Sequence, residues 1–168
     1  MPITYLKGDA TRPAGVGMKY IVHICNDVGG WGRGFVLALS KQWAEPERSY
    51  REWFKAQDHS LWGRFELGNI QSIQVRPDLY VIQMLAQEGY GTKNQAMHQS
   101  SVPNSTPPIR YKALEQCLEK VAVLAKSVGA SVHMPKIGSG LAGGDWSRIE
   151  EIINRTLIDS KVYVYVLA

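Results

Sequence analysis

His23 and Cys25 are two residues apart in the apolar run Tyr20–Cys25. Side chains alternate between the two faces of a strand, so this spacing places the imidazole and the thiol on the same face. A histidine at a strand end titrates near neutrality, and it could donate a proton to a leaving group or polarise a phosphate. A hydrogen-bonded core histidine is an equally good interpretation. Cys25 is typical of packing, because a small thiol on an apolar strand is usually buried and inert.

Other residues that could take part in chemistry also have a structural alternative. Asp145 could be a catalytic base, but its place before a helical pattern is more typical of an N-cap. Trp31 could stack on a bound sugar or phosphate region, or it could anchor its own loop. Lys93 and His98 lie in the polar segment 87–108, where a solvated surface role is the default. That segment is long for a connection, and segments of this size are usually functional lids or disordered.

A glycine-rich loop between a strand and a helix is the strongest local motif. The β-prone run Ala130–Met134 leads into Gly138-Ser-Gly-Leu-Ala-Gly-Gly144, and apolar residues at helical spacing follow. Such a loop exposes unpaired N–H groups and the positive end of a helix dipole, which favour phosphate or another anion. Its glycines let the backbone approach a ligand, although a flexible turn between core elements would have a similar sequence.

The spelling of this loop matches the dinucleotide-binding motif G-x-G-x-x-G, but its context excludes that fold. The fold requires an acidic residue roughly 20 positions later, at the end of the next strand. The next strand here is Val162–Leu167, and no acidic residue closes it. No Lys-Ser/Thr pair follows the glycines, so a P-loop is excluded as well.

A second loop of the same kind follows the strand Tyr20–Cys25. The stretch Asn26–Gly34 contains four glycines and runs into a helical pattern that starts near Phe35. If both loops lie at the same end of one sheet, two helix N-termini can hold a diphosphate from two sides. The pair of loops therefore predicts a ligand that contains phosphate.

Composition narrows the class of protein. The 168 residues are 45% hydrophobic, which suits one compact globular domain, and no apolar run or signal-peptide pattern indicates a membrane or an export route. We therefore expect a cytoplasmic protein. Two cysteines give no disulfide framework, and no Cys/His cluster has metal-binding spacing. The net charge of +4 is scattered, so it fits an anionic ligand without indicating nucleic-acid binding.

Hydrophobic periodicity predicts strands and helices that alternate along the chain. The expected elements are strands at Ile3–Lys7 and Tyr20–Cys25, helices from Phe35 and Pro46, strands at Leu67–Val75 and Leu79–Leu85, a helix at Ile109–Val128, a strand at Ala130–Met134, a helix from Trp146 and a strand at Val162–Leu167. The expected apolar positions are Leu37, Leu39 and Trp43 in the first helix, Tyr50, Trp53 and Phe54 in the second, Leu114, Leu118, Val121 and Leu124 in the third, and Trp146, Ile149, Ile152, Ile153 and Leu157 in the fourth. This order predicts an α/β protein, a three-layer α/β/α sandwich with a central mixed β-sheet in a single domain spanning residues 1–168.

Taken together, the motifs resemble those of macrodomains, which are ADP-ribose-binding modules. The resemblance rests on Gly8-Asp-Ala-Thr11 after the first strand, on Val22-His-Ile-Cys-Asn26 with the loop Gly29–Phe35, and on Pro135-Lys-Ile-Gly-Ser-Gly140 with its helix. It covers nearly the whole chain. The sequence is most similar to the subgroup of the fungal-type ADP-ribose 1''-phosphate phosphatase and the terminal ADP-ribose protein glycohydrolase, and it looks closer to the phosphatase.

The resemblance implies a site for ADP-ribose or ADP-ribose 1''-phosphate. Asp9 would contact the adenine amino group, and the backbone of Ala10, after Gly8, would contact a ring nitrogen. Asn26 would face the distal ribose, with Trp31 beside the ribose or its phosphate. The residues implied around the diphosphate are Gly32, Arg33, Gly34, Phe35, Ile137, Gly138, Ser139, Gly140, Leu141 and Ala142.

The sequence departs from the glycohydrolase pattern at two positions. Those enzymes have a lysine just after the strand that matches Leu79–Leu85, where this chain has Ala86-Gln-Glu88. They also have an aspartate two residues after the glycine that matches Gly140, where this chain has Ala142. A lysine-adduct mechanism is therefore not expected, unless Lys93 takes that place.

These observations lead to a hydrolase without metal or cofactor as the expected function. The expected reaction removes a group from the distal ribose, in the first place the phosphate of ADP-ribose 1''-phosphate. His23, Asn26 and Asp145 are the candidate catalytic residues. The alternatives are a non-catalytic reader of ADP-ribose or of ADP-ribosylated protein, and a hydrolase of ADP-ribosyl-protein or O-acetyl-ADP-ribose.

Overall fold

The computed structural model describes residues 3–89, 108–140 and 142–167. Its main sheet has six strands in the order β1-β8-β7-β2-β6-β5. The strands of this sheet are β1 (Ile3–Lys7), β2 (Lys19–Asn26), β5 (Ile70–Arg76), β6 (Leu79–Gln87), β7 (Ser131–Pro135) and β8 (Val162–Val166). The helices are α1 (Phe35–Gln42), α2 (Glu45–Ala56), α3 (Tyr111–Val128) and α4 (Trp146–Thr156). A two-stranded hairpin, β3 (Asp58–His59) and β4 (Gly63–Arg64), follows α2.

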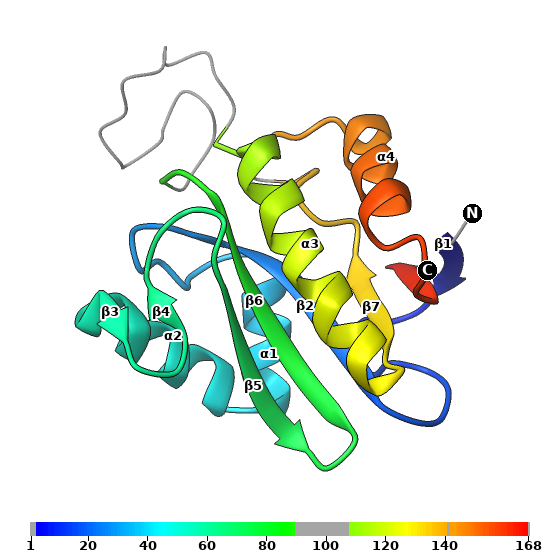
Figure 1. Ribbon diagram of the computed structural model, residues 1–168, viewed down its shortest axis with the longest axis horizontal. Helices are drawn as coiled ribbons and strands as arrows, with labels where there is room; N and C mark the ends of the chain where they lie inside the picture. The colour runs from blue at the N-terminus through cyan, green and yellow to red at the C-terminus, as the bar shows by residue number, and fades with distance from the viewer. Residues whose placement is uncertain (1–2, 90–107, 141, 168) are drawn as a thin grey trace.

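The main sheet is mixed, as the sequence predicts. The pairing of β5 with β6 is antiparallel, and the other pairings in this sheet are parallel. Helices α1 and α2 cover one face, and α3 and α4 cover the other (Figure 1). The predicted three-layer α/β/α sandwich is therefore confirmed.

Two hydrophobic cores lie on the two faces of the sheet. Alternation along β2 assigns its residues: Tyr20 and Val22 pack with α3 and α4, whereas Ile21 and Cys25 pack with α1 and α2. β6 follows the same rule, with Ile82 in the first core and Val81 in the second. Strands buried on both faces explain the nearly continuous apolar sequence of β2 and β6.

Local signals set the ends of the helices. Asp145 is the N-cap of α4, and its carboxylate accepts a hydrogen bond from the backbone N–H of Ser147 at 3.0 Å. α3 ends at Val128, and its C-cap Gly129 adopts the left-handed conformation that favours glycine. Pro46 lies in the first turn of α2, where its missing N–H costs no hydrogen bond.

The structure corrects several predicted boundaries and faces. β5 begins at Ile70 rather than Leu67, because Gly68 has a positive φ of 96° and breaks the extended run. α3 begins at Tyr111, two residues later than predicted, since Ile109 forms a β-bridge with Gln87. The hairpin β3–β4 was not predicted, because its strands are too short to show a period.

Two of the expected apolar positions are not buried as predicted. Leu37 is 48% exposed, because the buried face of α1 is formed by Val36 and Leu39, and Phe54 is 37% exposed beside the buried Tyr50 and Trp53 of α2. The polar segment 87–108 falls largely outside the described residues, and Lys93 and His98 lie there as well. Among the helices described, none is long and apolar enough to cross a membrane.

One buried histidine on β7 is held by its neighbours. The Nδ1 atom of His133 lies 2.8 Å from the hydroxyl of Tyr165, and Nε2 lies 2.7 Å from Oγ of Ser131. Burial lowers the pKa of His133 to about 4, and the charge of nearby Lys19 acts in the same direction. The folded state therefore keeps this ring neutral at pH values where an unfolded chain would protonate it.

We predict that the free energy of unfolding falls as the pH decreases from about 6.5 to about 4. In this range His133 binds a proton in the unfolded chain but stays neutral in the folded protein, so lower pH favours the unfolded state. His133 should contribute a slope of up to about 1.4 kcal/mol per pH unit in this window. The measurement is urea unfolding at several pH values for the wild type and His133→Gln. An equal slope in both proteins would show that His133 does not titrate as inferred.

Candidate active site

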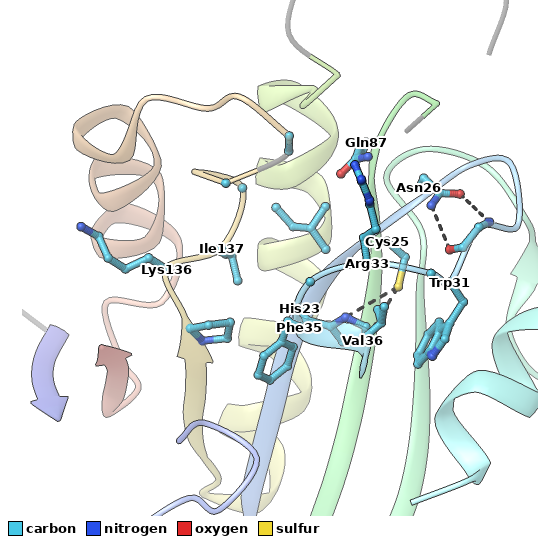
Figure 2. A pocket seen from close by; sticks show the side chains of 18 of the residues that line it. His23, Cys25, Asn26, Trp31, Arg33, Phe35, Val36, Gln87, Lys136 and Ile137 are labelled. Atoms are coloured by element: carbon cyan, nitrogen blue, oxygen red, sulfur yellow. Dashed lines mark hydrogen bonds between the residues drawn. The ribbon is translucent and has the colours of Figure 1, made fainter. Parts of the chain in front are cut away.

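The candidate site is a cavity of about 520 Å³ at the carboxyl ends of β2, β6 and β7 (Figure 2). β2 pairs with β7 only as far as Ile21↔His133, whereas it stays paired with β6 through Asn26. Pro135 ends β7 and has no N–H to donate across the gap. The chain leaves β2 toward one edge of the sheet and β7 toward the other. This divergence is the place where α/β sheets usually bind ligands.

The side chain of Asn26 holds the first glycine loop in place through hydrogen bonds to the loop backbone. Its Oδ1 accepts hydrogen bonds from the N–H groups of Val28 and Gly30 and from the Tyr50 hydroxyl, at 2.9 to 3.0 Å. Its Nδ2 donates to the Gly30 carbonyl at 2.9 Å. The carbonyl side of this amide is therefore saturated by the protein, and only the second N–H of Nδ2 remains for a ligand.

The N-terminus of α1 opens onto the cavity. Gly34 is its N-cap, with a φ of 78° that requires glycine and with no side-chain cap. Gly34, Phe35 and Val36 all line the cavity, and their N–H groups donate to no other described residue. This is the arrangement in which a helix terminus binds an anion.

The second glycine loop contributes its backbone but not its helix. Gly138 and Gly140 line the cavity, and their N–H groups have no acceptor among the described residues. Asp145 caps α4 and does not line the cavity, and its carboxylate accepts from the first turn of that helix, in the position that a bound anion would take. The contact of a ligand with two helix N-termini therefore stays a prediction, and the geometry supports it for α1 rather than for α4.

Trp31 serves as the anchor of its loop. Its indole N–H donates to Oγ of Ser40 at 2.8 Å, and its ring is only 5% exposed. The ring packs against Tyr50, at 5.4 Å between centroids, and meets His23 edge-on at 5.7 Å. These contacts favour the interpretation that Trp31 anchors its own loop, although the residue also borders the cavity.

His23 lies at the base of the cavity, deeper than Cys25 (Figure 2). It is 2% exposed, and its Nε2 lies 2.9 Å from Oε1 of Gln83. Burial lowers the pKa of His23 to about 4, and the hydrogen bond to Gln83 opposes that shift. The ring is therefore neutral at pH 7 and cannot act there as an imidazolium acid.

Cys25 is not an activated nucleophile. Its Sγ lies 3.8 and 3.9 Å from the two ring nitrogens of His23. Burial raises the pKa of the Cys25 thiol well above its usual range, which removes the thiolate that nucleophilic attack requires.

The described residues lining the cavity carry positive charge without a carboxylate. Arg33, Arg51 and Lys136 line it, and no Asp or Glu does so. Arg51 is partly engaged, because it donates to Glu47 and to the Gly29 carbonyl. Arg33 is exposed and has no ion-pair or hydrogen-bond partner within the described part of the chain. The cavity is therefore suited to a ligand with several negative charges.

The other sequence-predicted site residues lie outside this cavity. Gly8, Asp9 and Ala10 follow β1, and Ser139 lies between two lining glycines, but none of them lines it. Oδ1 of Asp9 accepts hydrogen bonds from the N–H and Oγ1 of Thr11, at 2.8 and 2.7 Å. Leu141 lies outside the described residues. The predicted residues that do come together here are His23, Asn26, Trp31, Gly32, Arg33, Gly34, Phe35, Ile137, Gly138, Gly140 and Ala142.

Sequence reasoning missed several lining residues. Arg51 comes from α2, and nothing in the sequence marks it as part of a site. Gln87 and Lys136 end or follow strands next to β2 and could have been found from the predicted sheet. Within the described part of the chain, no three His, Cys, Asp or Glu side chains lie close enough together to hold a metal ion.

Comparison with known proteins places this geometry among its relatives. No family model matches the chain. It is 33% identical over 98% of its length to the mouse chromodomain-helicase-DNA-binding protein 1-like, of which it spans only 17%. It is 27% identical to an ADP-ribose 1''-phosphate phosphatase from Lodderomyces elongisporus, over 98% of this chain and 99% of that protein.

A solved structure is similar over the full length. The macrodomain protein from Streptomyces coelicolor is 42% identical, with a TM-score of 0.79 and 98% of each chain covered. Identity at this level over both whole chains exceeds what a shared fold alone requires. We conclude that the chain belongs to the macrodomain family.

Proposed function

We propose that the cavity binds the distal ribose and diphosphate of ADP-ribose and that the protein hydrolyses a group on that ribose. The proposed substrate is ADP-ribose 1''-phosphate, which with water gives ADP-ribose and phosphate. Support for this substrate comes from the similarity to the fungal phosphatase over nearly the whole length of both chains.

The observation that carries the proposal is the set of anion-binding groups around one cavity. Two loops present N–H groups without an acceptor in the described part of the chain, and three cations among the described residues line the same space as an uncapped helix N-terminus. A diphosphate uses both kinds of group, because its oxygens accept hydrogen bonds and its charge requires compensation. A neutral sugar or an apolar ligand would leave the charge of Arg33, which has no partner among the described residues, without compensation.

The chemistry available to these residues is positioning and electrostatic stabilisation. The cations and the α1 N-terminus can stabilise the charge that develops on a departing phosphate. The neutral His23 can orient a water or hydroxyl group by accepting a hydrogen bond, and Asn26 can donate one N–H to the sugar. We assign no step to Asp145, whose carboxylate caps α4.

A second candidate function is a reader that binds ADP-ribose without hydrolysing it. This alternative is favoured by one observation, the lack of a carboxylate among the described lining residues, because hydrolysis usually employs a general base. A hydrolase of ADP-ribosyl-protein or O-acetyl-ADP-ribose would meet the same objection. The two main candidates make different predictions for turnover.

We predict slow phosphate release from ADP-ribose 1''-phosphate in the presence of a metal chelator. His23→Ala should lower turnover by about 10² or more, well beyond its effect on affinity, because it removes a group that can orient a water or a hydroxyl of the substrate. His59→Ala, on the distant β3–β4 hairpin, is the matched control and should keep the wild-type rate. Tight binding of ADP-ribose by the wild type with no release of phosphate would establish the reader in place of the enzyme.

We predict that Asp9→Asn weakens ADP-ribose binding by about tenfold, because a charged acceptor for the adenine amino group is lost. Asparagine keeps the oxygen that accepts from Thr11, so the thermal midpoint should hardly change. Asp9→Ala should weaken binding as well, and it should also remove the hydrogen bonds from Thr11 that hold the turn. Calorimetric titration with ADP-ribose and with AMP measures the effect, and unchanged affinity would remove adenine from this position.

We predict that Gly140→Val abolishes ADP-ribose binding without unfolding the protein. A Cβ at Gly140 meets no atom within 4 Å, so the added side chain occupies space that the ligand needs rather than the core. Gly144→Ala is the contrasting variant, because its Cβ would lie 2.5 Å from the Gly138 carbonyl oxygen and 2.8 Å from Ile149. It should lower the thermal midpoint. Normal binding by a folded Gly140→Val protein would show that this loop does not touch the ligand.

A further inference from the structure

Three polar side chains form one row across the core below the cavity. His23 on β2 is in register with Gln83 on β6, and Gln83 is in register with Gln71 on β5. All three are buried, with Gln71 and Gln83 fully so. They are joined by hydrogen bonds of 2.9 Å from His23 to Gln83 and 2.7 Å from Gln83 to Gln71.

The neighbouring rows on the same face are apolar. The row two residues earlier consists of Ile21, Val81 and Ile73, and the row two residues later contains Cys25 and Leu85. Aliphatic side chains therefore fit this layer, and burying polar groups there costs free energy unless each is paired. A row of polar side chains in this layer therefore indicates a functional role. His23, at one end of the row, lies at the base of the cavity.

Backbone carbonyls fix the orientation of both amides. Nε2 of Gln71 donates to the Ser49 carbonyl, and Nε2 of Gln83 donates to the Pro46 carbonyl, each at 2.8 Å. A carbonyl can only accept, so the NH₂ group must face it in both cases. Oε1 of Gln71 then accepts the second N–H of Gln83, and Oε1 of Gln83 is left facing His23.

This orientation determines the tautomer of His23. Oε1 of Gln83 has no hydrogen, so Nε2 of His23 must carry the proton that lies between them. A neutral imidazole has one N–H, which leaves Nδ1 as an acceptor. The Cys25 sulfur lies 3.9 Å from Nδ1 and 3.8 Å from Nε2, so this weak donor is not directed at Nδ1 in particular. Among the described residues, Nδ1 therefore has no strong hydrogen-bond partner.

We propose that Gln83 is a positioning residue that holds His23 in the Nε2–H tautomer, so that Nδ1 accepts a hydrogen bond from a hydroxyl of the ligand's distal sugar. The ligand contact rests on the proposed function, whereas the tautomer does not. An acceptor at this point selects a hydroxyl over a phosphate oxygen, because two acceptors facing each other repel. The sugar rather than the phosphate would then occupy the base of the cavity.

The tautomer is tested first, in the wild-type protein without ligand. Two-bond ¹⁵N–¹H correlation spectra of the histidine rings should show His23 as neutral with the proton on Nε2, and His133 is an internal reference in the same spectrum. Gln83→Met should lose this fixed pattern for His23 and leave His133 unchanged. Gln71→Met should keep it, because Pro46 still orients Gln83. A wild-type His23 protonated on Nδ1, or on both nitrogens, would overturn the proposal whether or not the variants fold.

The ligand contact is tested by calorimetry with two probes. Gln83→Met should weaken the binding of ADP-ribose by about tenfold and leave the binding of ADP, which lacks the distal ribose, nearly unchanged. Gln74→Met, the same substitution at an exposed position on β5, is the matched control and should affect neither. An equal loss of affinity for ADP-ribose and for ADP would show that Gln83 has a structural role only and would contradict the proposed contact with the distal sugar. Failure of the wild type to bind ADP-ribose would overturn the proposed function and the ligand contact together, while the spectra would still decide the tautomer.

Discussion

The site depends on the early end of the pairing between β2 and β7. These parallel strands are joined from Lys19↔Ser131 to Ile21↔His133 and then separate, while β2 continues beside β6 to Asn26. Because the backbone of β2 is held on its other side, the separation opens a space lined by strand ends without breaking the sheet. Both glycine loops start from the two strands that border this space. The two loops therefore lie at the same cavity because of the strand order in the sheet.

The glycines of the two loops are needed for different physical reasons. Gly34 supplies a positive φ at the start of α1, and Gly144 supplies room, since a Cβ there would collide with the Gly138 carbonyl and Ile149. Gly138 does both, because its φ is 73° and a Cβ would collide with Ile109. Gly140 has neither a positive φ nor a neighbour within 4 Å of a Cβ. Its lack of a side chain is best explained by the cavity it lines. Glycine content alone thus does not separate residues that shape the loop from residues that make space for a ligand.

The rim and the base of the cavity differ in charge. The rim is cationic, through Arg33, Arg51 and Lys136, whereas the base holds a histidine that burial keeps neutral. A low dielectric at the base strengthens each hydrogen bond made there, but it also makes a charged imidazolium costly. The geometry therefore assigns charge compensation to the rim and orientation to the base. This division suits a ligand with a charged diphosphate and a neutral sugar.

The sequence by itself determined the order of the main-sheet strands and the helices along the chain, the mixed sheet and the two glycine-rich loops, because each depends on local periodicity and glycine spacing. The N-cap role of Asp145 was readable for the same reason, since its partner Ser147 is two residues away. Tertiary structure alone decided that, of the helices described, α1 presents its terminus to the cavity while α4 does not, and that Arg51 lines the cavity. It also decided the state of His23, because that state depends on Gln83, which lies on another strand and is 60 residues distant along the chain. Pairing across strands sets a proton's position here, and no local pattern in the sequence records that pairing.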